Sequence, residues 1–420
     1  MASSSTDTAA AGQWADLLPE LCSLVLDRLD AFDLLRFAAV CKPWAAACKA
    51  TSRHHLRPGA PTLLTSGLHP NDAATTFALH DVSTGNSFHA AAAAGLGGGR
   101  WWVGGKDDWL VTTDGDCNVE LLHPGTGDRI RLPPFTTIPT AKLEKTLLSI
   151  EKPRCVYAFQ QVRLCRTPAH PDGYFAVAQF GHAFLAFTVA GDEGWTPLRN
   201  HLQGYVAYED AIAHGGKIFA VSWDGDVFYW SIDGGAGDHP AVVHAPPELR
   251  MHRWLRQSFS LAPSSGGGDG RVLVVCTYGP IGLLRGTWPP VVRKKVHAQL
   301  AFIHATGALL LELDVARGDT DGAWRRVSGL DGGGGGGRAL FLGASYPFYV
   351  AVPPHGSNGL IRANCVYHAH MSCHDAVVFD LGKGCAGGFE PLVYPNAGNP
   401  LHTPMWFRPS APRLDFGKER

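Results

Sequence analysis

The residues with the greatest potential for chemistry form the run His368-Ala369-His370-Met371-Ser372-Cys373-His374-Asp375 near the end of the chain. On a strand, His368 and His370 would face the same side, and His374 or Asp375 could return around a turn to complete a metal site. The chain has 20 histidines, however, and the same run fits an exposed loop between two strands. We favour the loop and expect neither a metal nor a cofactor.

Other catalytic patterns do not occur in the sequence. The glycine runs at residues 95–99 and 332–337 do not link a strand to a helix, and there is no G-x-x-x-x-G-K-[ST] phosphate loop or G-x-S-x-G elbow. Trp101, Trp102 and Trp109 fit a buried core better than a ligand-stacking surface. We therefore expect no catalytic residues and a protein that is not an enzyme.

Composition narrows the class of protein further. The formal net charge is −1, and the longest basic run is Arg293-Lys294-Lys295, so we expect no nucleic-acid partner. Residues 1–13 lack the features of a secretory signal, and no apolar run approaches the roughly 20 residues that span a bilayer. The ten cysteines form no C-x-x-C pair. We expect an intracellular protein, nuclear and/or cytoplasmic, with reduced cysteines and no membrane contact.

Residues 14–49 have the pattern of three short helices. Pro19 suits the first helical position, and the following apolar residues recur with helical spacing. Asp33 can cap a second helix by accepting from the N–H groups of its first turn, and Pro43 can open a third. A unit of this size has too little core to bury all its apolar side chains alone.

This stretch resembles an F-box. The residues that carry the resemblance are Leu18-Pro19-Glu20-Leu21, Leu24, Val25, Leu29, Asp33-Leu34-Leu35-Arg36-Phe37, Val40-Cys41-Lys42 and Trp44. The resemblance implies docking onto a Skp-like adaptor, and through it a cullin, in a ubiquitin ligase. The alternative is a helical hairpin that only packs on the domain behind it. The residues that we expect to contact the adaptor are Leu18, Pro19, Leu21, Leu24, Val25, Leu35, Val40 and Trp44.

Beyond the proline-rich residues 57–61 the sequence predicts strands and no long amphipathic helix. Fifteen candidate strands are residues 77–82, 101–103, 109–113, 119–122, 155–164, 174–180, 184–189, 217–223, 227–232, 272–277, 296–303, 309–315, 339–342, 364–368 and 376–381. Asp-Gly pairs, which favour type I′ hairpins, begin at Asp114, Asp172, Asp224, Asp269 and Asp321, at intervals of roughly 50 residues as in a kelch-like propeller, and further pairs at Asp233 and Asp331 lie off that spacing. We expect a mostly β fold with six to eight blades.

The same region resembles a plant propeller family, the KIB type, that is found behind F-boxes. The stretches that carry the resemblance include residues 104–112, 121–134, 208–214, 216–221, 324–327, 339–343 and 364–367, with departures at Asp108 and His123. The expected domains are a disordered N-terminus (1–13), the F-box (14–50), a linker (51–61), the propeller (62–408) and a tail (409–420).

Together the two resemblances imply the substrate-recognition subunit of a Skp-cullin-F-box type E3 ubiquitin ligase, with a protein target on the propeller. Residues 136–152 and 244–256 are the least patterned segments, and we expect target-reading loops among them. Two alternatives stay open. One is an adaptor-independent interaction protein with a degenerate F-box, and the other is a propeller enzyme or metal-binding protein that uses the His368–Asp375 run.

Overall fold

The structure is a computed structural model of the 420-residue chain. It describes two regions with gaps between their segments. The N-terminal region comprises residues 17–26, 29, 37, 40–44 and 46–47. The second region comprises residues 61–66, 76–83, 85, 87–91, 100–114, 116–124, 127–138, 159–180, 184–200, 206–232, 240–250, 256–266, 270–279, 281–283, 301–303, 307–317, 323–330, 337–352, 361–369, 376–383, 389–392 and 404–408.

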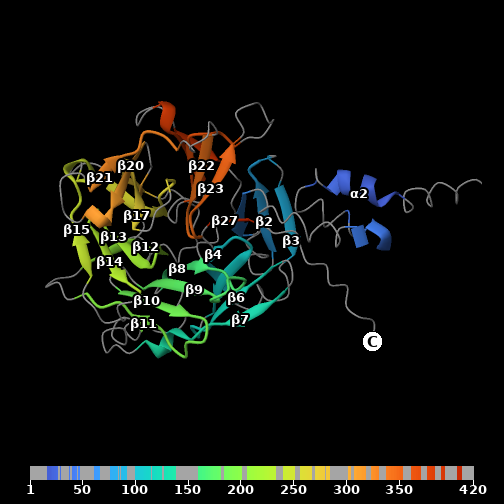
Figure 1. The fold of residues 1–420 in the computed structure, drawn as a ribbon, viewed down its shortest axis with the longest axis horizontal. Helices are drawn as coiled ribbons and strands as arrows, with labels where there is room; N and C mark the ends of the chain where they lie inside the picture. The colour runs from blue at the N-terminus through green and yellow to red at the C-terminus, as the bar shows by residue number, and fades with distance from the viewer. Residues whose placement is uncertain are drawn as a thin grey trace, which may run out of the picture.

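Six sheets stand around a common centre as the blades of a propeller (Figure 1). Blade 1 contains β27 (Met405–Phe407), β1 (Thr62–Ser66), β2 (Thr76–Asp81) and β3 (Ser87–Ala91). Blade 2 contains β4 (Trp101–Lys106), β5 (Trp109–Thr113), β6 (Val119–Leu122) and β7 (Arg129–Arg131). Blade 3 contains β8 (Phe159–Arg166), β9 (Phe175–Phe180), β10 (Phe184–Val189) and β11 (Thr196–Pro197). In these three sheets the strands nearest the centre are β27, β4 and β8 (Figure 1).

The ring continues with three more sheets. Blade 4 contains β12 (Tyr208–His214), β13 (Lys217–Ser222), β14 (Val227–Ser231) and β15 (Ala241–Val243). Blade 5 contains β16 (Arg256–Pro263), β17 (Arg271–Gly279), β20 (Gly307–Asp314) and β21 (Trp324–Arg326). Blade 6 contains β23 (Phe348–Val352), β22 (Gly337–Leu342), β24 (Cys365–Ala369), β25 (Ala376–Asp380) and β26 (Phe389–Leu392), and β22 pairs with β24 in parallel.

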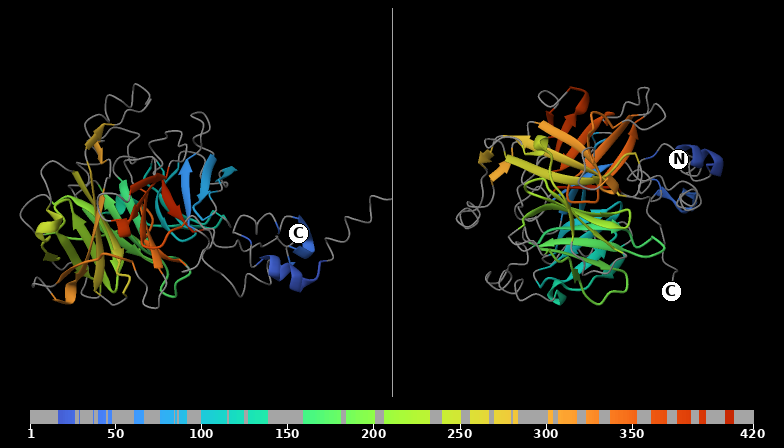
Figure 2. Two further views of the ribbon diagram at one scale, coloured as in Figure 1. Left: turned by 90° about the horizontal axis from the view of Figure 1, so that it is seen from above. Right: turned by 60° about the vertical axis from the view of Figure 1, so that its left-hand side comes forward.

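Short elements join these blades. A ribbon of β18 (Ile281–Leu283) and β19 (Ala301–Ile303) interrupts blade 5 and projects from the ring (Figure 2). The short 3-10 helices are η1 (Phe135–Thr137), η3 (Pro247–Leu249), η4 (Val315–Arg317) and η5 (Leu381–Lys383). The prediction of a mostly β propeller is confirmed, with six blades in the described part of the chain, and the specifically kelch-like character stays a prediction.

The middle strands are apolar because both of their faces are covered by neighbouring blades. All six residues of β9 are buried, for example, and Phe219 of blade 4 packs in one cluster with Phe259 and Val274 of blade 5. Sheets packed in this way bury side chains on alternate sides of each strand. This arrangement explains why runs of mainly apolar residues predicted the middle strands so well.

The ring closes by joining the two ends of the propeller in blade 1. Strand β27, from near the C-terminus, pairs antiparallel with β1, and Leu63 lies opposite Trp406. Trp406 is 1% exposed, its indole N–H donates to the Leu342 carbonyl at 2.7 Å, and its ring meets Phe341 edge to face. The last blade is thus locked to the first by a buried aromatic side chain.

Two of the Asp-Gly pairs are fully described and lie in hairpins that are not equivalent, whereas those at Asp114, Asp269 and Asp321 fall wholly or partly outside the described residues. Asp172-Gly173 precedes the second strand of blade 3, whereas Asp224-Gly225 joins the second and third strands of blade 4. The expected type I′ turn is wrong at both pairs, because that turn needs a positive φ at two residues and only Gly173 (71°) and Gly225 (86°) have one. In blade 4 the Gly225 N–H donates to the Ser222 carbonyl at 2.9 Å, as in a type I turn followed by a glycine bulge.

The N-terminal helices lie outside the ring (Figures 1 and 2). Helix α2 (Pro19–Leu26) is the first of the three that the sequence predicts. Phe37, Val40 and residues 42–44 are helical as well, but the bounds of the other two helices fall partly outside the described residues. The three-helix arrangement therefore stays a prediction. No helix in the described part of the chain is long and apolar enough to cross a membrane.

A disulfide at Cys117 departs from the expectation that all cysteines are reduced. Cys117 is disulfide-bonded, whereas Cys22, Cys165, Cys276 and Cys365 are buried and form no disulfide. The expectation was wrong at Cys117 because disulfide pairing depends on which side chains the fold brings together, and sequence spacing does not show this.

Replacement of Trp406 by alanine tests the closure. We expect Trp406→Ala to lower the free energy of unfolding by about 3–5 kcal/mol, because it empties a fully buried site, as measured by chemical denaturation. Trp223→Ala is the matched control, since Trp223 is 62% exposed and should change that free energy by less than about 0.5 kcal/mol. Equal effects of the two variants would show that Trp406 does not close the ring.

Candidate functional site

Helix α2 begins where the sequence places its start. The Leu18 carbonyl accepts from the N–H groups of Leu21 and Cys22, both at 3.0 Å, so Leu18 is the capping residue before Pro19. Proline is favoured at the first helical position because its φ is already helical and no helical partner exists there for an N–H. The acidic Glu20 in the first turn suits the positive end of the helix dipole.

One face of α2 packs on a small core of its own. Cys22 and Leu26 are buried together with Phe37, and Trp44 stacks on Phe37 with ring centroids 4.2 Å apart. Cys22 and Leu26 are four residues apart and therefore lie on the same side of the helix. This cluster orients α2 and keeps its opposite side free of these neighbours.

The other face of α2 is apolar and exposed. Leu18 is 62%, Leu21 46%, Leu24 61% and Val25 40% exposed, and Val40 nearby in sequence is 60% exposed. Each of these side chains would gain roughly 1.5–3 kcal/mol if it were fully buried. In the described chain the other large exposed apolar side chain is Trp223 on the propeller. Most of the large apolar side chains that are exposed in the described chain therefore lie in the N-terminal region.

The predicted adaptor-contact residues fall into three groups in the structure. Leu18, Leu21, Leu24 and Val25 are exposed along α2 and at its start, and we call them the α2 surface; Val40, outside this helix, is exposed as well. Pro19 opens α2, but the structure does not describe its side chain, and Leu35 lies outside the described residues. Trp44 is half-buried against Phe37.

Sequence reasoning missed a buried ionic network at the centre of the propeller. Arg163 on β8 holds Asp210 on β12 through one guanidinium nitrogen that lies 2.8 Å from each carboxylate oxygen, and it also donates to the Ser345 carbonyl. The Asp210 carboxylate accepts from the backbone N–H groups of Leu261 and Ala211, each at 2.8 Å. Burial raises the pKa of Asp210, and the Arg163 guanidinium opposes that shift. The network ties blades 3, 4 and 5 to the segment that follows β22.

The groups beside this network are not set up for nucleophilic chemistry. The Cys165 sulfur accepts from the Ala213 N–H at 3.2 Å, and burial raises the pKa of its thiol to about 11. The Tyr346 hydroxyl donates to the Ala213 carbonyl at 3.1 Å, and burial raises its pKa too. Both side chains are therefore protonated at neutral pH, and a thiol reacts only as the thiolate. These contacts hold the blades together.

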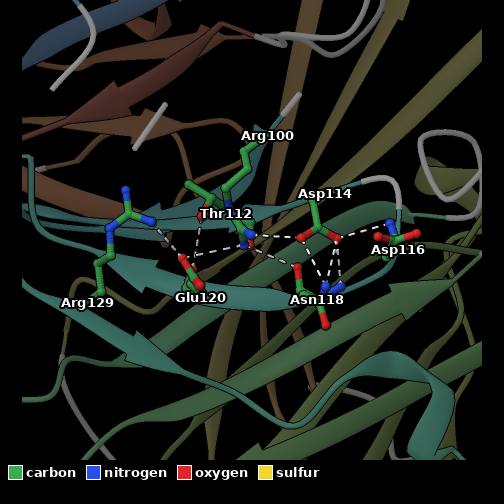
Figure 3. Close-up of polar contacts among 7 residues, drawn as sticks. All are labelled: Arg100, Thr112, Asp114, Asp116, Asn118, Glu120 and Arg129. Atoms are coloured by element: carbon green, nitrogen blue, oxygen red, sulfur yellow. Dashed lines mark hydrogen bonds and ion pairs between the residues drawn. The ribbon is translucent and has the colours of Figure 1, made fainter. Parts of the chain in front are cut away.

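A second polar network runs along blade 2 (Figure 3). Arg100 lies between Asp114, at 2.8 Å, and Glu120, at 3.6 Å, and Arg129 reaches Glu120 from the other side at 3.1 Å. Asn118 donates to Asp114 through both its backbone and its side chain. Burial acts to raise the pKa of Asp114, but these hydrogen bonds and Arg100 lower it overall. The carboxylates already have protein partners, so the network holds the β5–β6 hairpin.

The histidine run near the C-terminus is described only in part. His368 lies on β24, is buried, and is 3.3 Å from the Ser260 hydroxyl through its Nε2 atom. His370, His374 and Asp375 lie outside the described residues. Within the described residues no group of three or more metal-binding side chains comes together.

The central ion pair gives a prediction with a defined pH dependence. We expect Arg163→Met to cost about 3–5 kcal/mol of unfolding free energy at pH 7, because it leaves Asp210 buried and unpaired. Without the guanidinium, burial raises the pKa of Asp210 in the folded state further above its value in the unfolded state. The free energy of unfolding of the variant therefore falls as pH increases. The penalty should therefore shrink between pH 7 and about pH 5 in denaturation experiments.

The control for this pH effect is the double variant Arg163→Met with Asp210→Asn, which has no carboxyl group to titrate. Its unfolding free energy relative to wild type should not show the same change with pH. If Arg163→Met loses the same amount of unfolding free energy at every pH, Asp210 is not the group whose titration sets the pH dependence.

Comparisons with known proteins agree with this architecture. The F-box domain model matches residues 14–56, and the KIB1-4 β-propeller model matches residues 78–380. No curated protein matches the chain.

Solved structures that resemble the chain at low TM-score include the following three. The β-propeller domain of Cps50 (Swd1) from Myceliophteria thermophila is 8% identical, with a TM-score of 0.32 over 80% of this chain and 87% of that one. A chain of a nidogen/laminin complex is 9% identical, with a TM-score of 0.38 over 84% and 99%. YCF48 from Cyanidioschyzon merolae is 12% identical, with a TM-score of 0.33 over 66% and 72%.

The ring of six blades and the family match describe the same part of the molecule. Because the propeller model alone covers more than half of the sequence, the chain belongs to the KIB1-4 β-propeller family, and it carries an F-box domain in front of the propeller.

Proposed function

We propose that the chain is the substrate-recognition subunit of a Skp-cullin-F-box type E3 ubiquitin ligase. The observation that carries this proposal is the α2 surface, an exposed apolar face inside the segment that matches an F-box. F-box domains generally bind Skp-like adaptors, and a groove lined with apolar residues is the kind of partner surface that takes up such a helix face. Cullin would then be reached through the adaptor.

The residues proposed for adaptor contact are the exposed ones together with Pro19, Leu35 and Trp44. Leu18, Leu21 and Val25 follow a helical spacing of three and four residues, so one groove can hold them together. Trp44 would support this contact from the Phe37 cluster, where its ring is stacked. A few anchors of this kind carry most of the binding energy of an interface.

The propeller would bind the protein target. F-box and propeller domains are typically non-catalytic interaction modules, and ubiquitin transfer would be carried out by other subunits of the ligase. The role of this chain is then to hold the target close to the transferring subunits, which raises its effective concentration. Since that machinery acts inside the cell, we place the protein in the nucleus and/or cytoplasm.

Trp223 is the part of the propeller best suited to contact the target. Its side chain lies exposed in the β13–β14 turn. Its backbone N–H donates to the Ala207 carbonyl at 2.9 Å, which fixes the turn. Asp226, at the end of the same turn, lies 3.2 Å from His244 and 3.3 Å from Arg250, so part of segment 244–256 lies beside it. Exposed tryptophans and arginines are the most frequent anchors of protein interfaces.

Adaptor binding is tested with the purified chain and a purified Skp-like adaptor in calorimetry. We expect the double variant Leu18→Ala with Leu21→Ala to lose more than about 2 kcal/mol of binding free energy. Both side chains are exposed in the free protein, so the free energy of unfolding should change by less than about 0.5 kcal/mol per site.

Trp223→Ala serves as the matched control, because it removes an equally exposed apolar side chain from the propeller and should bind the adaptor as wild type does. If wild type does not bind the adaptor, the ligase proposal fails. The chain would then be an adaptor-independent interaction protein.

Target binding is tested by proximity labelling in cells with the full chain fused to a labelling enzyme. We expect Trp223→Ala to lose proteins that wild type labels, whereas the Leu18→Ala with Leu21→Ala variant keeps them, because the two surfaces act separately. The same proteins labelled by wild type and by Trp223→Ala would exclude Trp223 as a target anchor.

A further inference from the structure

Two cationic side chains lie at the ends of neighbouring inner strands, β4 and β27. Lys106 is the last residue of β4, and Arg408 directly follows β27. Backbone hydrogen bonds of 2.8 Å fix this arrangement, one from the Arg408 N–H to the Asp107 carbonyl and one from the Tyr346 N–H to the Gly105 carbonyl. The positions of both cations are therefore set by the ring itself.

Each cation rests on an aromatic ring of the same segment. The Lys106 ammonium lies 3.6 Å from the centroid of the Tyr346 ring, and the Arg408 guanidinium carbon lies 4.8 Å from that of Phe348. Such contacts hold a cation through the ring face and leave its N–H donors available for other partners. Tyr346 and Phe348 are two residues apart, and Arg408 lies close enough to Lys106 to act on its pKa.

Two of the donor groups on these cations lack an acceptor within the described residues. The Lys106 ammonium has no hydrogen bond or ion pair there, and the buried Arg408 Nε atom has no acceptor. Among the described residues the carboxylate paired with Arg408 is that of Asp107, which lies 3.5 Å from a terminal nitrogen and is 40% exposed. Buried polar groups nearly always have a partner, so an orphaned donor indicates that a partner is missing.

We propose that Lys106 and Arg408 form a binding site for a carboxylate group. Two positive charges and the negative charge of Asp107 leave a net charge of about +1, which a monoanionic carboxylate neutralises. The Lys106 ammonium and the terminal guanidinium nitrogens of Arg408 donate to the oxygens of the bound carboxylate, and charge-assisted hydrogen bonds of this kind are the strong ones. Both side chains are partly exposed and can be reached from solvent.

The electrostatic surroundings of Lys106 agree with this assignment. Burial lowers the pKa of Lys106, while Asp107 acts to raise it and Arg408 to lower it further. The Cys165 thiol, the other titratable group that acts on Lys106, is protonated at neutral pH. A bound anion would remove the cost of holding two cations together in a partly buried place.

The carboxylate has two possible sources, namely a peptide and a small free acid. The site is independent of adaptor binding, so it can be tested on the chain alone. The probe is the full-length chain with its lysines ¹³C-dimethylated, which keeps their positive charge. The Lys106 signal is assigned in NMR spectra by its loss in Lys106→Arg. The titrants are acetate and the capped peptide Gly-Gly-Glu-Gly-Gly, at constant ionic strength set with chloride.

We expect the Lys106 signal to shift and saturate with the carboxylate titrants. The matched control is Lys217, a half-buried lysine at the start of β13, whose signal should not shift. Arg408→Gln should weaken binding at least about tenfold, the effect of losing one charge-assisted hydrogen bond. Tighter binding of the peptide than of acetate assigns the site to a peptide carboxylate, and equal binding assigns it to a free acid.

Three results would overturn the proposal. The Lys106 signal of the wild-type chain could fail to saturate, it could shift no more than that of Lys217, or the same peptide with Gln in place of Glu could bind equally well. The first two are measured on the wild-type chain, so they decide the matter even if a variant fails to fold.

Discussion

The buried ion pair between Arg163 and Asp210 is the interaction on which the propeller depends most. It joins the inner strands of blades 3 and 4 and, through the Leu261 N–H and the Ser345 carbonyl, reaches blade 5 and the segment after β22. A pair buried this deeply is tolerable only when its hydrogen bonds are satisfied, and here the ring supplies them from several blades. Trp406 adds a second constraint of this kind, because its indole N–H joins blade 1, near the C-terminus of the chain, to Leu342 of blade 6.

A closed ring of this kind leaves few apolar side chains over for recognition. On the propeller the large exposed one within the described residues is Trp223, whereas the short α2 helix exposes several. This contrast follows from size, because a helical unit of about 35 residues, whose described residues bury Cys22, Leu26 and Phe37, has too small a core to cover both sides of its first helix. Stability and recognition are therefore divided between the two parts of the chain.

The sequence predicted the parts of the fold in which local pattern and tertiary environment agree. The predicted residues 109–113, 119–122 and 184–189 are the bounds of β5, β6 and β10, because middle strands are apolar on both faces. Inner strands β12 and β16 were missed as candidate strands, since Asp210 and Ser260 interrupt their apolar pattern and find partners only in the assembled ring. Outer strands such as β11 and β15 are too short to carry a pattern.

The candidate site was predictable to a similar degree. The α2 surface was named from its F-box resemblance and helical spacing, and the structure adds which of its residues are exposed and that Trp44 packs on Phe37. The Arg163–Asp210 pair and the Lys106–Arg408 pair could not be found in this way. Their members are 47 and about 300 residues apart in the chain, and no local pattern links them.

The most direct test of the account is oxidative footprinting of the full chain with and without a purified Skp-like adaptor. The account predicts that the adaptor protects Leu18, Leu21, Leu24 and Val25 from oxidation, while Trp223 on the propeller stays as reactive as before. Unchanged reactivity of the α2 surface at saturating adaptor, or protection at Trp223 instead, would contradict the claim that this helix face is the docking surface.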